Sequence, residues 1–155
     1  MTLLKLIGSI IVCQVAGIIG ALFTSPAIKG WYSNLNKPSF NPPNWIFGPV
    51  WTALYLLMGI SLFLVWKKYN GDSNIKIALT IFFFQLVLNT LWSIMFFGLR
   101  NPMAGFIVIV VLWIAILLTI ISFYKYSITA SMLLIPYILW VSFATVLNYY
   151  LWKLN

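Results

Sequence analysis

Acidic and metal-binding side chains are almost absent from this 155-residue chain. It contains one acidic residue, Asp72, one cysteine, Cys13, and no histidine. A single cysteine excludes an intrachain disulfide. Because the apolar segments hold neither carboxylate nor imidazole, metal clusters, Ser-His-Asp triads and paired-carboxylate hydrolysis all lack their residues. The same absence argues against a proton-coupled pump, which needs an acidic group inside the membrane.

Charged residues of any kind are scarce, since they make up 6% of the chain while hydrophobic residues make up 63%. The mean hydropathy is +1.04. A water-soluble domain needs far more polar surface than this composition supplies. We therefore expect an integral, multi-pass membrane protein in contact with the lipid bilayer, with residues 1–155 forming a single domain.

The net charge of +8 arises because acids are missing, while nine Lys and Arg residues are spread along the segment ends. The clustered basic residues of a nucleic-acid surface are not found, so we expect no nucleic-acid partner. Anchoring to anionic headgroups explains the charge, and an anionic ligand is the alternative explanation.

Five apolar stretches are long enough to cross a bilayer. They are Leu6–Phe23, Trp45–Trp66, Ile77–Leu99, Met103–Tyr124 and Ile128–Trp152. The sequence thus predicts an all-α integral membrane protein, a bundle of five transmembrane helices with its termini on opposite sides.

Local signals set several boundaries of these spans. Ser25-Pro26 is expected to end the first span, and Asn101-Pro102 to start the fourth as N-cap and first helical residue. Pro136 cannot donate a hydrogen bond to Met132, which predicts a kink in the fifth span. Because the fourth span has few polar residues, we interpret it as mostly lipid-facing.

The connection between the first two spans is long, aromatic and rich in proline. Three prolines, Pro38, Pro42 and Pro43, forbid a continuous helix through the first half of Trp31–Trp51. A loop that only joins two helices needs a few polar residues, so we interpret this one as a lid or pocket wall. The alternative is an interfacial aromatic belt with prolines shaping a turn.

Aromatic and amide side chains recur at helical spacing on three spans. These stripes are Trp51, Tyr55 and Met58 on the second span; Gln85, Asn89, Trp92 and Phe96 on the third; and Pro136, Trp140, Phe143, Ala144 and Asn148 on the fifth. Amides in hydrocarbon are costly unless they are paired or face a cavity. We interpret the stripes as walls of a cavity for a large, flat, mainly apolar ligand. The alternative is that the tryptophans anchor the protein at the interface and the amides join helices.

Four ordered motifs resemble the TspO/translocator-protein family, the tryptophan-rich sensory proteins that include the peripheral-type benzodiazepine receptor. The motifs are Trp31-Tyr32-x-x-Leu35-x-Lys37-Pro38, Phe47-Gly48-Pro49-Val50-Trp51, Gln85-x-x-x-Asn89-x-x-Trp92 and Pro136-Tyr137-x-x-Trp140. The resemblance covers nearly the whole chain. It implies a five-helix bundle, usually a homodimer, that needs no cofactor and binds tetrapyrroles such as protoporphyrin IX and haem. It also implies binding of isoquinoline and benzodiazepine compounds.

The motifs and the stripes together give the expected ligand-binding residues. These are Trp31, Tyr32, Pro42, Trp51, Tyr55, Gln85, Asn89, Trp92, Phe96, Trp140, Phe143, Ala144 and Asn148. Without histidine, haem has no His axial ligand, so a free-base porphyrin held by stacking fits better.

The resemblance also implies two alternative functions. Some bacterial members degrade porphyrin in light and oxygen, and the tryptophans implicated match Trp51 and Trp140, which are the expected catalytic residues. Eukaryotic members bind cholesterol through the end of the fifth helix, where Val146, Tyr149 and Lys153 fit the sterol pattern. That pattern is short and common.

The basic residues at the segment ends predict the orientation. One side has Lys5, Lys67, Lys68, Lys76 and Lys125, and the other has Lys29, Lys37, Arg100 and Lys153. Five against four favours a cytoplasmic N-terminus, and we expect the protein in a bacterial cell membrane.

Overall fold

The computed structural model describes residues 2–155, and all regular secondary structure in that range is helical. The α-helices are α1 (Thr2–Lys29), α2 (Phe47–Trp66), α3 (Ser73–Ser93), α4 (Pro102–Tyr124), α5 (Ile128–Leu133) and α6 (Ile135–Lys153). Two 3₁₀ turns, η1 (Tyr32–Asn34) and η2 (Asn44–Ile46), precede α2, and a π-helix, η3 (Ile94–Gly98), follows α3. Within residues 2–155, five helical segments are long and apolar enough to cross a membrane, so the prediction of five spans is confirmed.

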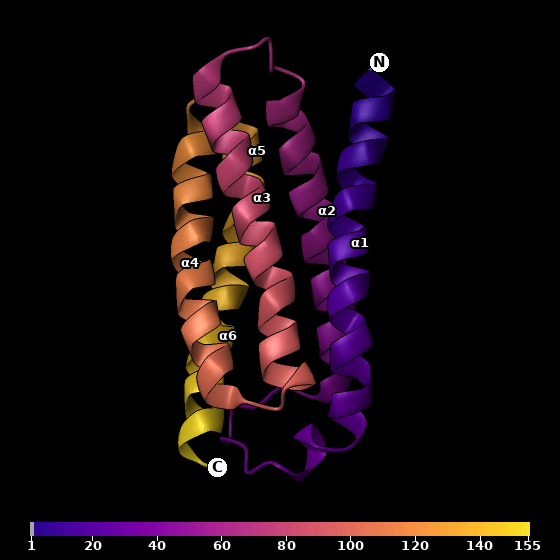
Figure 1. Cartoon of the computed structure of the whole chain (residues 1–155), viewed down its shortest axis with the longest axis vertical. Helices are drawn as coiled ribbons and strands as arrows, with labels where there is room; N and C mark the ends of the chain where they lie inside the picture. Colours follow the sequence, from indigo (N-terminus) through magenta and orange to yellow (C-terminus); the bar gives the residue numbers. More distant parts are fainter. Residues whose placement is uncertain (1) are drawn as a thin grey trace.

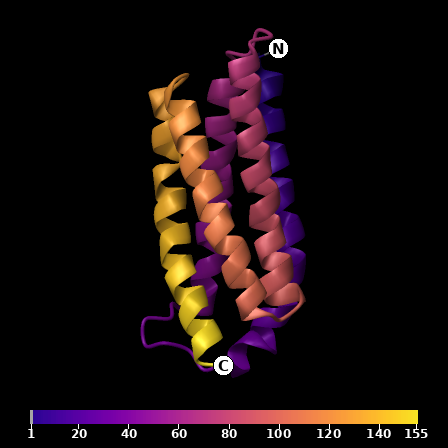
Figure 2. The same cartoon turned by 60° about the vertical axis from the view of Figure 1, so that its left-hand side comes forward.

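The helices stand side by side as an elongated bundle (Figure 1). The two chain ends lie at opposite ends of it. The connection between α1 and α2, residues 30–46, crosses the end that also holds the C-terminus (Figures 1 and 2). The α2–α3 and α4–α5 connections lie at the other end. A ligand site under the α1–α2 connection would therefore be at the C-terminal end.

Side-chain caps begin three of the helices. Asn101 Oδ1 accepts a hydrogen bond from the backbone N–H of Ala104 at 3.1 Å, and Pro102 is the first residue of α4, which confirms that predicted start. Asp72 Oδ1 accepts from Asn74 N–H at 2.9 Å, directly after Gly71, whose φ of 94° suits glycine. These caps satisfy N–H groups that a helix cannot pair internally.

The predicted end of the first span is wrong, because α1 continues through Pro26 to Lys29. A proline inside a helix removes one backbone hydrogen bond. Ala27 is buried and Ile28 packs beside it against a second core cluster that includes Tyr32 and Phe96. This burial offsets the missing hydrogen bond and holds the last turn of α1.

The third and fifth spans are less regular than one continuous helix. After Ser93 the third span widens into the π-helix η3, and Arg100 follows with a left-handed φ of 54°. The fifth span is interrupted at Leu134, between α5 and α6, two residues before Pro136. The interruption agrees with the predicted effect of a proline that cannot donate a backbone hydrogen bond.

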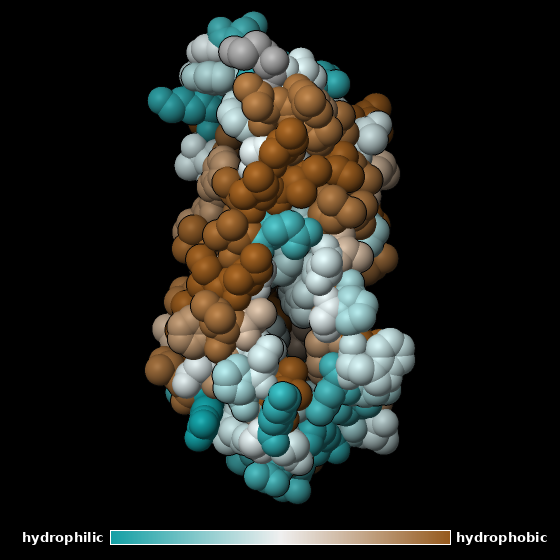
Figure 3. All heavy atoms as spheres, turned by 90° about the vertical axis from the view of Figure 1, so that its right-hand side faces the viewer, coloured by the Kyte–Doolittle hydropathy of each residue, from teal (hydrophilic) through white to brown (hydrophobic). Residues whose placement is uncertain are grey.

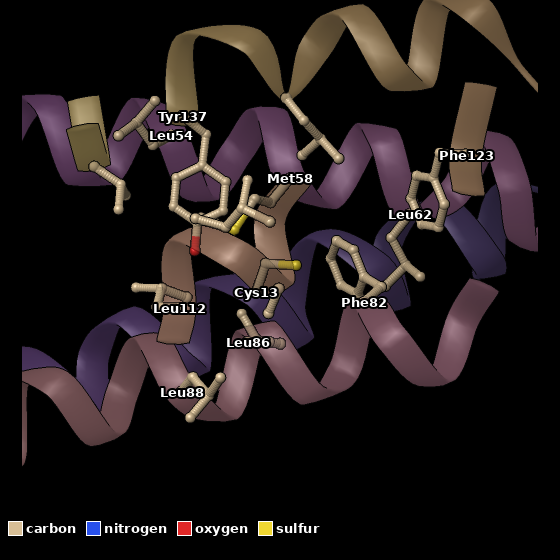
Figure 4. Packing of buried hydrophobic residues seen from close by; sticks show 14 of the residues in the cluster. Cys13, Leu54, Met58, Leu62, Phe82, Leu86, Leu88, Leu112, Phe123 and Tyr137 are labelled. Atoms are coloured by element: carbon tan, nitrogen blue, oxygen red, sulfur yellow. The ribbon is translucent and has the colours of Figure 1, made fainter. Parts of the chain in front are cut away.

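Of the five spans α1 is the least buried and α4 is the next, which agrees with the interpretation of the fourth span as mostly lipid-facing. In the apolar stretch of each helix, 33% of the residues are buried in α4 and 17% in α1. Small and branched residues of α4, such as Gly105, Ala115 and Ile116, are buried in the bundle. The main core cluster joins all five spans, and Figure 4 shows Cys13, Met58 and Leu86 gathered in it from α1, α2 and α3.

Candidate functional site

A cavity of about 480 Å³ lies between α1, α2, the α3–η3 segment and α6, at the end of the bundle covered by the α1–α2 connection. Most of the predicted ligand-binding residues line it: Tyr32, Trp51, Tyr55, Trp92, Phe96, Trp140, Phe143, Ala144 and Asn148. Four others are outside its lining: Trp31, Pro42, Gln85 and Asn89. The volume falls in the usual range for small-molecule sites.

Aromatic rings form the inner walls of the cavity. The Trp51 ring centroid is 5.7 Å from that of Tyr55 and 6.4 Å from that of Trp92. On α6, the Trp140 ring lies 5.4 Å from Phe143 and 6.2 Å from Phe47. Such rings offer flat apolar faces without charge.

The π-helix adds an aromatic residue that is not among the predicted ligand-binding residues. The Trp92 ring is stacked on Phe96 at 5.5 Å and meets Phe97 edge-on at 5.8 Å. In an α-helix the residues four and five positions on point in different directions, whereas the wider π turn keeps both close to one side. Phe97 thereby joins the cavity lining.

One wall of the cavity comes from α1, and it too was missed. Residues of α1 that line it include Gln14, Gly17, Gly20, Ala21, Thr24 and Lys29. A Cβ at Gly17 would lie 2.6 Å from the Tyr55 ring, so only glycine lets that ring lie against α1. Gly17, Gly20 and Ala21 recur at three- and four-residue spacing, which is typical of close helix packing and does not by itself indicate a cavity wall.

The cavity opens sideways between α1 and α2. Ile18 of α1, which is 60% exposed, and Thr52 of α2, which is exposed, both line it. Figure 3 shows the hollow in the lower half of this face, where pale and teal residues interrupt a largely brown surface. The opening is therefore bordered by the outer surface of the two helices, beside the α1–α2 connection.

The amides Gln85 and Asn89 lie behind the cavity wall, each 1% exposed. Tyr55 OH donates to Asn89 Oδ1 at 2.6 Å, and Asn89 Nδ2 donates to Tyr137 OH at 2.6 Å. Tyr137 OH in turn donates to Gln85 Oε1 at 2.7 Å. This network joins α2, α3 and α6 and holds the cavity-lining Tyr55 in place. Gln85 and Asn89 therefore follow the alternative given above, in which the amides join helices.

A second hydrogen-bond pair orients Trp92. Its indole Nε1 donates to Asn148 Oδ1 at 2.9 Å, and Asn148 Nδ2 donates to the carbonyl of Pro102 at 2.8 Å. Among the described residues the buried Nε1 of Trp140 has no partner. The two indoles thus differ, since Trp92 is held by α6 and α4 through polar contacts and Trp140 by packing.

The α1–α2 connection is fixed by its own contacts. Tyr32 is buried, and its hydroxyl donates to Asn41 Oδ1 at 2.8 Å. Burial raises the pKa of Tyr32 to about 12, which favours the protonated hydroxyl that donates this hydrogen bond. Trp31 packs edge-on against Phe96 at 5.5 Å. Trp31 thus supports the cavity from outside its lining.

The connection is also paired with the last residue of the chain. Asn36 N–H donates to Asn155 Oδ1, and Asn155 Nδ2 donates to the Asn36 carbonyl, both at 3.0 Å. The side-chain amide of Asn155 thereby pairs with both backbone groups of Asn36. Phe40 adds an apolar contact, 5.4 Å from Tyr150.

Replacing Asn155 with alanine should expose the backbone of Asn36. Both hydrogen bonds to the Asn36 backbone are lost, together with the one that Asn155 donates to the Leu151 carbonyl, and we expect hydrogen exchange of the Asn36 amide to accelerate about tenfold. Exchange followed by mass spectrometry or NMR in detergent would measure this. The control is Asn34→Ala, which removes a nearby asparagine side chain that takes no part in the hydrogen bonds of Asn36 within residues 2–155. Equal exchange in both variants would show that the pairing does not hold the connection.

The predicted sterol residues lie elsewhere. Val146 is 50% exposed, Tyr149 and Lys153 are also exposed, and none of them lines the cavity. The Lys153 amine lies 4.2 Å from the Trp152 ring centroid and 5.8 Å from that of Tyr149. They form a surface on the outside of α6.

Comparison with known proteins gives consistent matches along the whole chain. The family described as "TspO/MBR family" matches residues 9–153. The chain is 47% identical to the tryptophan-rich protein TspO of Archaeoglobus fulgidus, over 100% of this chain and 99% of that protein. It is 37% identical to the human translocator protein, over 88% of this chain and 82% of that protein. It is 38% identical to a tryptophan-rich sensory protein of Cereibacter sphaeroides, over 81% of this chain and 77% of that protein.

Proposed function

Because the chain belongs to the TspO/MBR family, we propose that it is a receptor-like or transporter-like membrane protein that binds tetrapyrroles in the cavity. The resemblance drawn from the four motifs is confirmed by this membership. The chain is an integral, multi-pass membrane protein, with five helical segments able to span the bilayer. Protoporphyrin IX and haem are the ligands that we propose.

The observation that supports this proposal is the aromatic lining of the cavity. Trp51, Trp92 and Trp140 come from three different helices and line one space. A flat macrocycle can stack on such rings, which carry no charge of their own. Isoquinoline carboxamides and benzodiazepines are smaller flat ligands that suit the same walls, and we propose them as synthetic ligands.

Replacing Trp51 with alanine should weaken porphyrin binding. Loss of one stacking face costs about 1.4 kcal/mol, which is roughly a tenfold rise in Kd. Quenching of protein fluorescence by protoporphyrin IX in reconstituted protein would measure the affinity. Trp66→Ala is the control, because Trp66 ends α2 at the far end of the bundle and is not part of the cavity lining. Equal affinities for wild type and Trp51→Ala would place the porphyrin elsewhere.

A second candidate is a porphyrin-degrading enzyme, and the position of two tryptophans favours it. Trp51 and Trp140 both line the cavity, from α2 and α6. Electron transfer from an indole to a photoexcited macrocycle needs only proximity. In this alternative, light and oxygen consume the bound porphyrin, and loss of porphyrin absorbance under light separates it from simple binding.

The remaining expectations stay proposals. A sterol would bind on the outer surface of α6 at Val146, Tyr149 and Lys153, so a sterol that displaces porphyrin from the cavity would contradict that placement. A homodimer is implied by the family resemblance, and its mass in detergent would test it.

We also propose that the N-terminus is cytoplasmic, in a bacterial cell membrane, following the positive-inside count. The end of the bundle that holds the cavity would then lie on the side of the membrane away from the cytoplasm. A reporter that is active only in the cytoplasm, fused to the N-terminus, would test the orientation.

A further inference from the structure

One cationic side chain belongs to the cavity. Ala21, Ser25 and Lys29 follow one another at intervals of four residues, so they share a face of α1, and all three line the cavity. Asn44 of η2 lines it as well. Among the lining residues, all of which lie within residues 2–155, Lys29 is the only charged one. Its end of the cavity therefore combines a lysine with neutral polar groups.

The other basic residues at this end are held elsewhere. The Lys37 amine donates to the carbonyls of Ser33 and Leu35 and lies 5.0 Å from the Tyr32 ring centroid. Lys153 lies over the Trp152 ring. Neither residue lines the cavity, and Arg100 does not line it either.

No acidic side chain competes for Lys29. The single acidic residue of the sequence, Asp72, caps α3 at the opposite end of the bundle. A ligand anion that reaches Lys29 therefore meets an amine without a carboxylate side chain beside it. The rest of the lining contributes no opposing charge.

The cavity is polar at one end and aromatic at the other. Gly17, which faces Tyr55, precedes Lys29 by twelve residues of α1, or about 18 Å along the helix axis. A macrocycle with carboxylate side chains can extend over much of that distance, with its ring against Trp51 and its carboxylate toward Lys29. The lysine stem is flexible enough to shorten the remaining gap.

We propose that Lys29 makes the cavity selective for ligands that join a flat apolar body to a carboxylate. This inference rests on the proposed tetrapyrrole binding and names the chemical class that the site prefers. A lipid phosphate is the other source of an anionic oxygen near Lys29. Lys29 is an exposed residue that also lines the cavity, and we favour the ligand carboxylate because of this position in the lining.

The test compares one macrocycle with and without its charge. Protoporphyrin IX and its dimethyl ester are titrated into wild type, Lys29→Gln and Arg100→Gln in phosphatidylcholine nanodiscs. Arg100→Gln is the matched control, because it removes one positive charge at the same end from a residue outside the cavity lining. Comparing each ligand across variants cancels its own partitioning into lipid.

For Lys29→Gln we expect the Kd of the free acid to rise about threefold to fivefold, the range of a partly exposed ion pair. The Kd of the ester should be unchanged, and Arg100→Gln should change neither value. Equal losses for both ligands would make Lys29 a neutral part of the wall and overturn the inference. Unchanged values for both ligands would also overturn it.

Two further outcomes separate failure of the inference from failure of the proposed function. If the effect of Lys29→Gln appears only when anionic lipid is added to the discs, Lys29 binds headgroups and the inference fails. If wild type binds neither porphyrin, the proposed function fails and the inference fails with it. If wild type binds both porphyrins, and the ratio of the Kd of the acid to the Kd of the ester is the same in Lys29→Gln, the inference about Lys29 fails while the proposed function stands.

Discussion

Asn89→Leu is expected to destabilise the bundle by about 2 kcal/mol, because a buried hydroxyl loses its acceptor. Asn89 accepts from Tyr55 OH and donates to Tyr137 OH, and all three groups are buried. Leucine has a similar size, so packing changes little while both hydrogen bonds disappear. Tyr137 keeps its bond to Gln85, whereas Tyr55 OH is left without an acceptor. Unfolding in mixed micelles, followed by circular dichroism, would measure the loss.

The same substitution should weaken porphyrin binding by about 1 kcal/mol or more, through Tyr55. Asn89 does not line the cavity, but Tyr55 does, and its ring lies against Gly17 and Trp51. A ring without its hydroxyl partner is no longer held at this position. Unchanged affinity in a folded variant would show that packing alone places Tyr55.

A double-mutant cycle separates the hydrogen bond from packing. Tyr55→Phe removes the donor, so Tyr55→Phe with Asn89→Leu leaves no unpaired hydroxyl at that pair. We expect the double variant to be more stable than the sum of the two single losses predicts. Additive losses would mean that the two side chains stabilise the bundle independently.

Trp51→Phe combined with Trp140→Phe is expected to keep most of the porphyrin affinity and to abolish light-dependent porphyrin loss. Stacking needs only a flat ring, which phenylalanine supplies. Electron donation to a photoexcited macrocycle needs the more easily oxidised indole, which phenylalanine lacks. Porphyrin absorbance under illumination in air, corrected for a protein-free sample, gives the rate, and fluorescence quenching gives the affinity.

Trp66→Phe is the control for this pair, since it removes an indole that does not line the cavity. If affinity and photochemistry fall together, the two tryptophans act only as walls. If wild type causes no porphyrin loss above the protein-free sample, the enzyme alternative fails and the binding proposal stands by itself.

The spans were predictable because hydropathy acts over whole helices, whereas the ends depend on tertiary packing. Asn101 and Pro102 carry their own signal for a helix start. Pro26 carries a local signal to stop, which the burial of Ala27 overrides. The π turn at Ile94–Gly98 has no local signal of comparable strength, so Phe97 was missed as a lining residue.

Those parts of the site that carry large aromatic or amide side chains were predictable from the sequence. Large aromatic residues at helical spacing, such as Trp51 and Trp140, indicated cavity walls on α2 and α6, and both line the cavity. The amide of Asn89 had to be either hydrogen-bonded to another helix or exposed to a cavity. The spacing of residues along one helix cannot decide between these two, because the partners of Asn89 are on other helices. Glycine has no side chain that could indicate a ligand, so the α1 wall around Gly17 was not predicted.

Because the cavity opens sideways between α1 and α2, the ligand concentration that determines its occupancy is the one in the lipid. Ile18 and Thr52 border the cavity and belong to helical segments that are long and apolar enough to cross a membrane. An apolar macrocycle dissolves in the bilayer, so occupancy of such a site follows its mole fraction in the lipid rather than its molarity in water. At a fixed total amount of porphyrin, added lipid dilutes the ligand and lowers occupancy. Affinities of this protein are therefore comparable only at equal lipid-to-protein ratios.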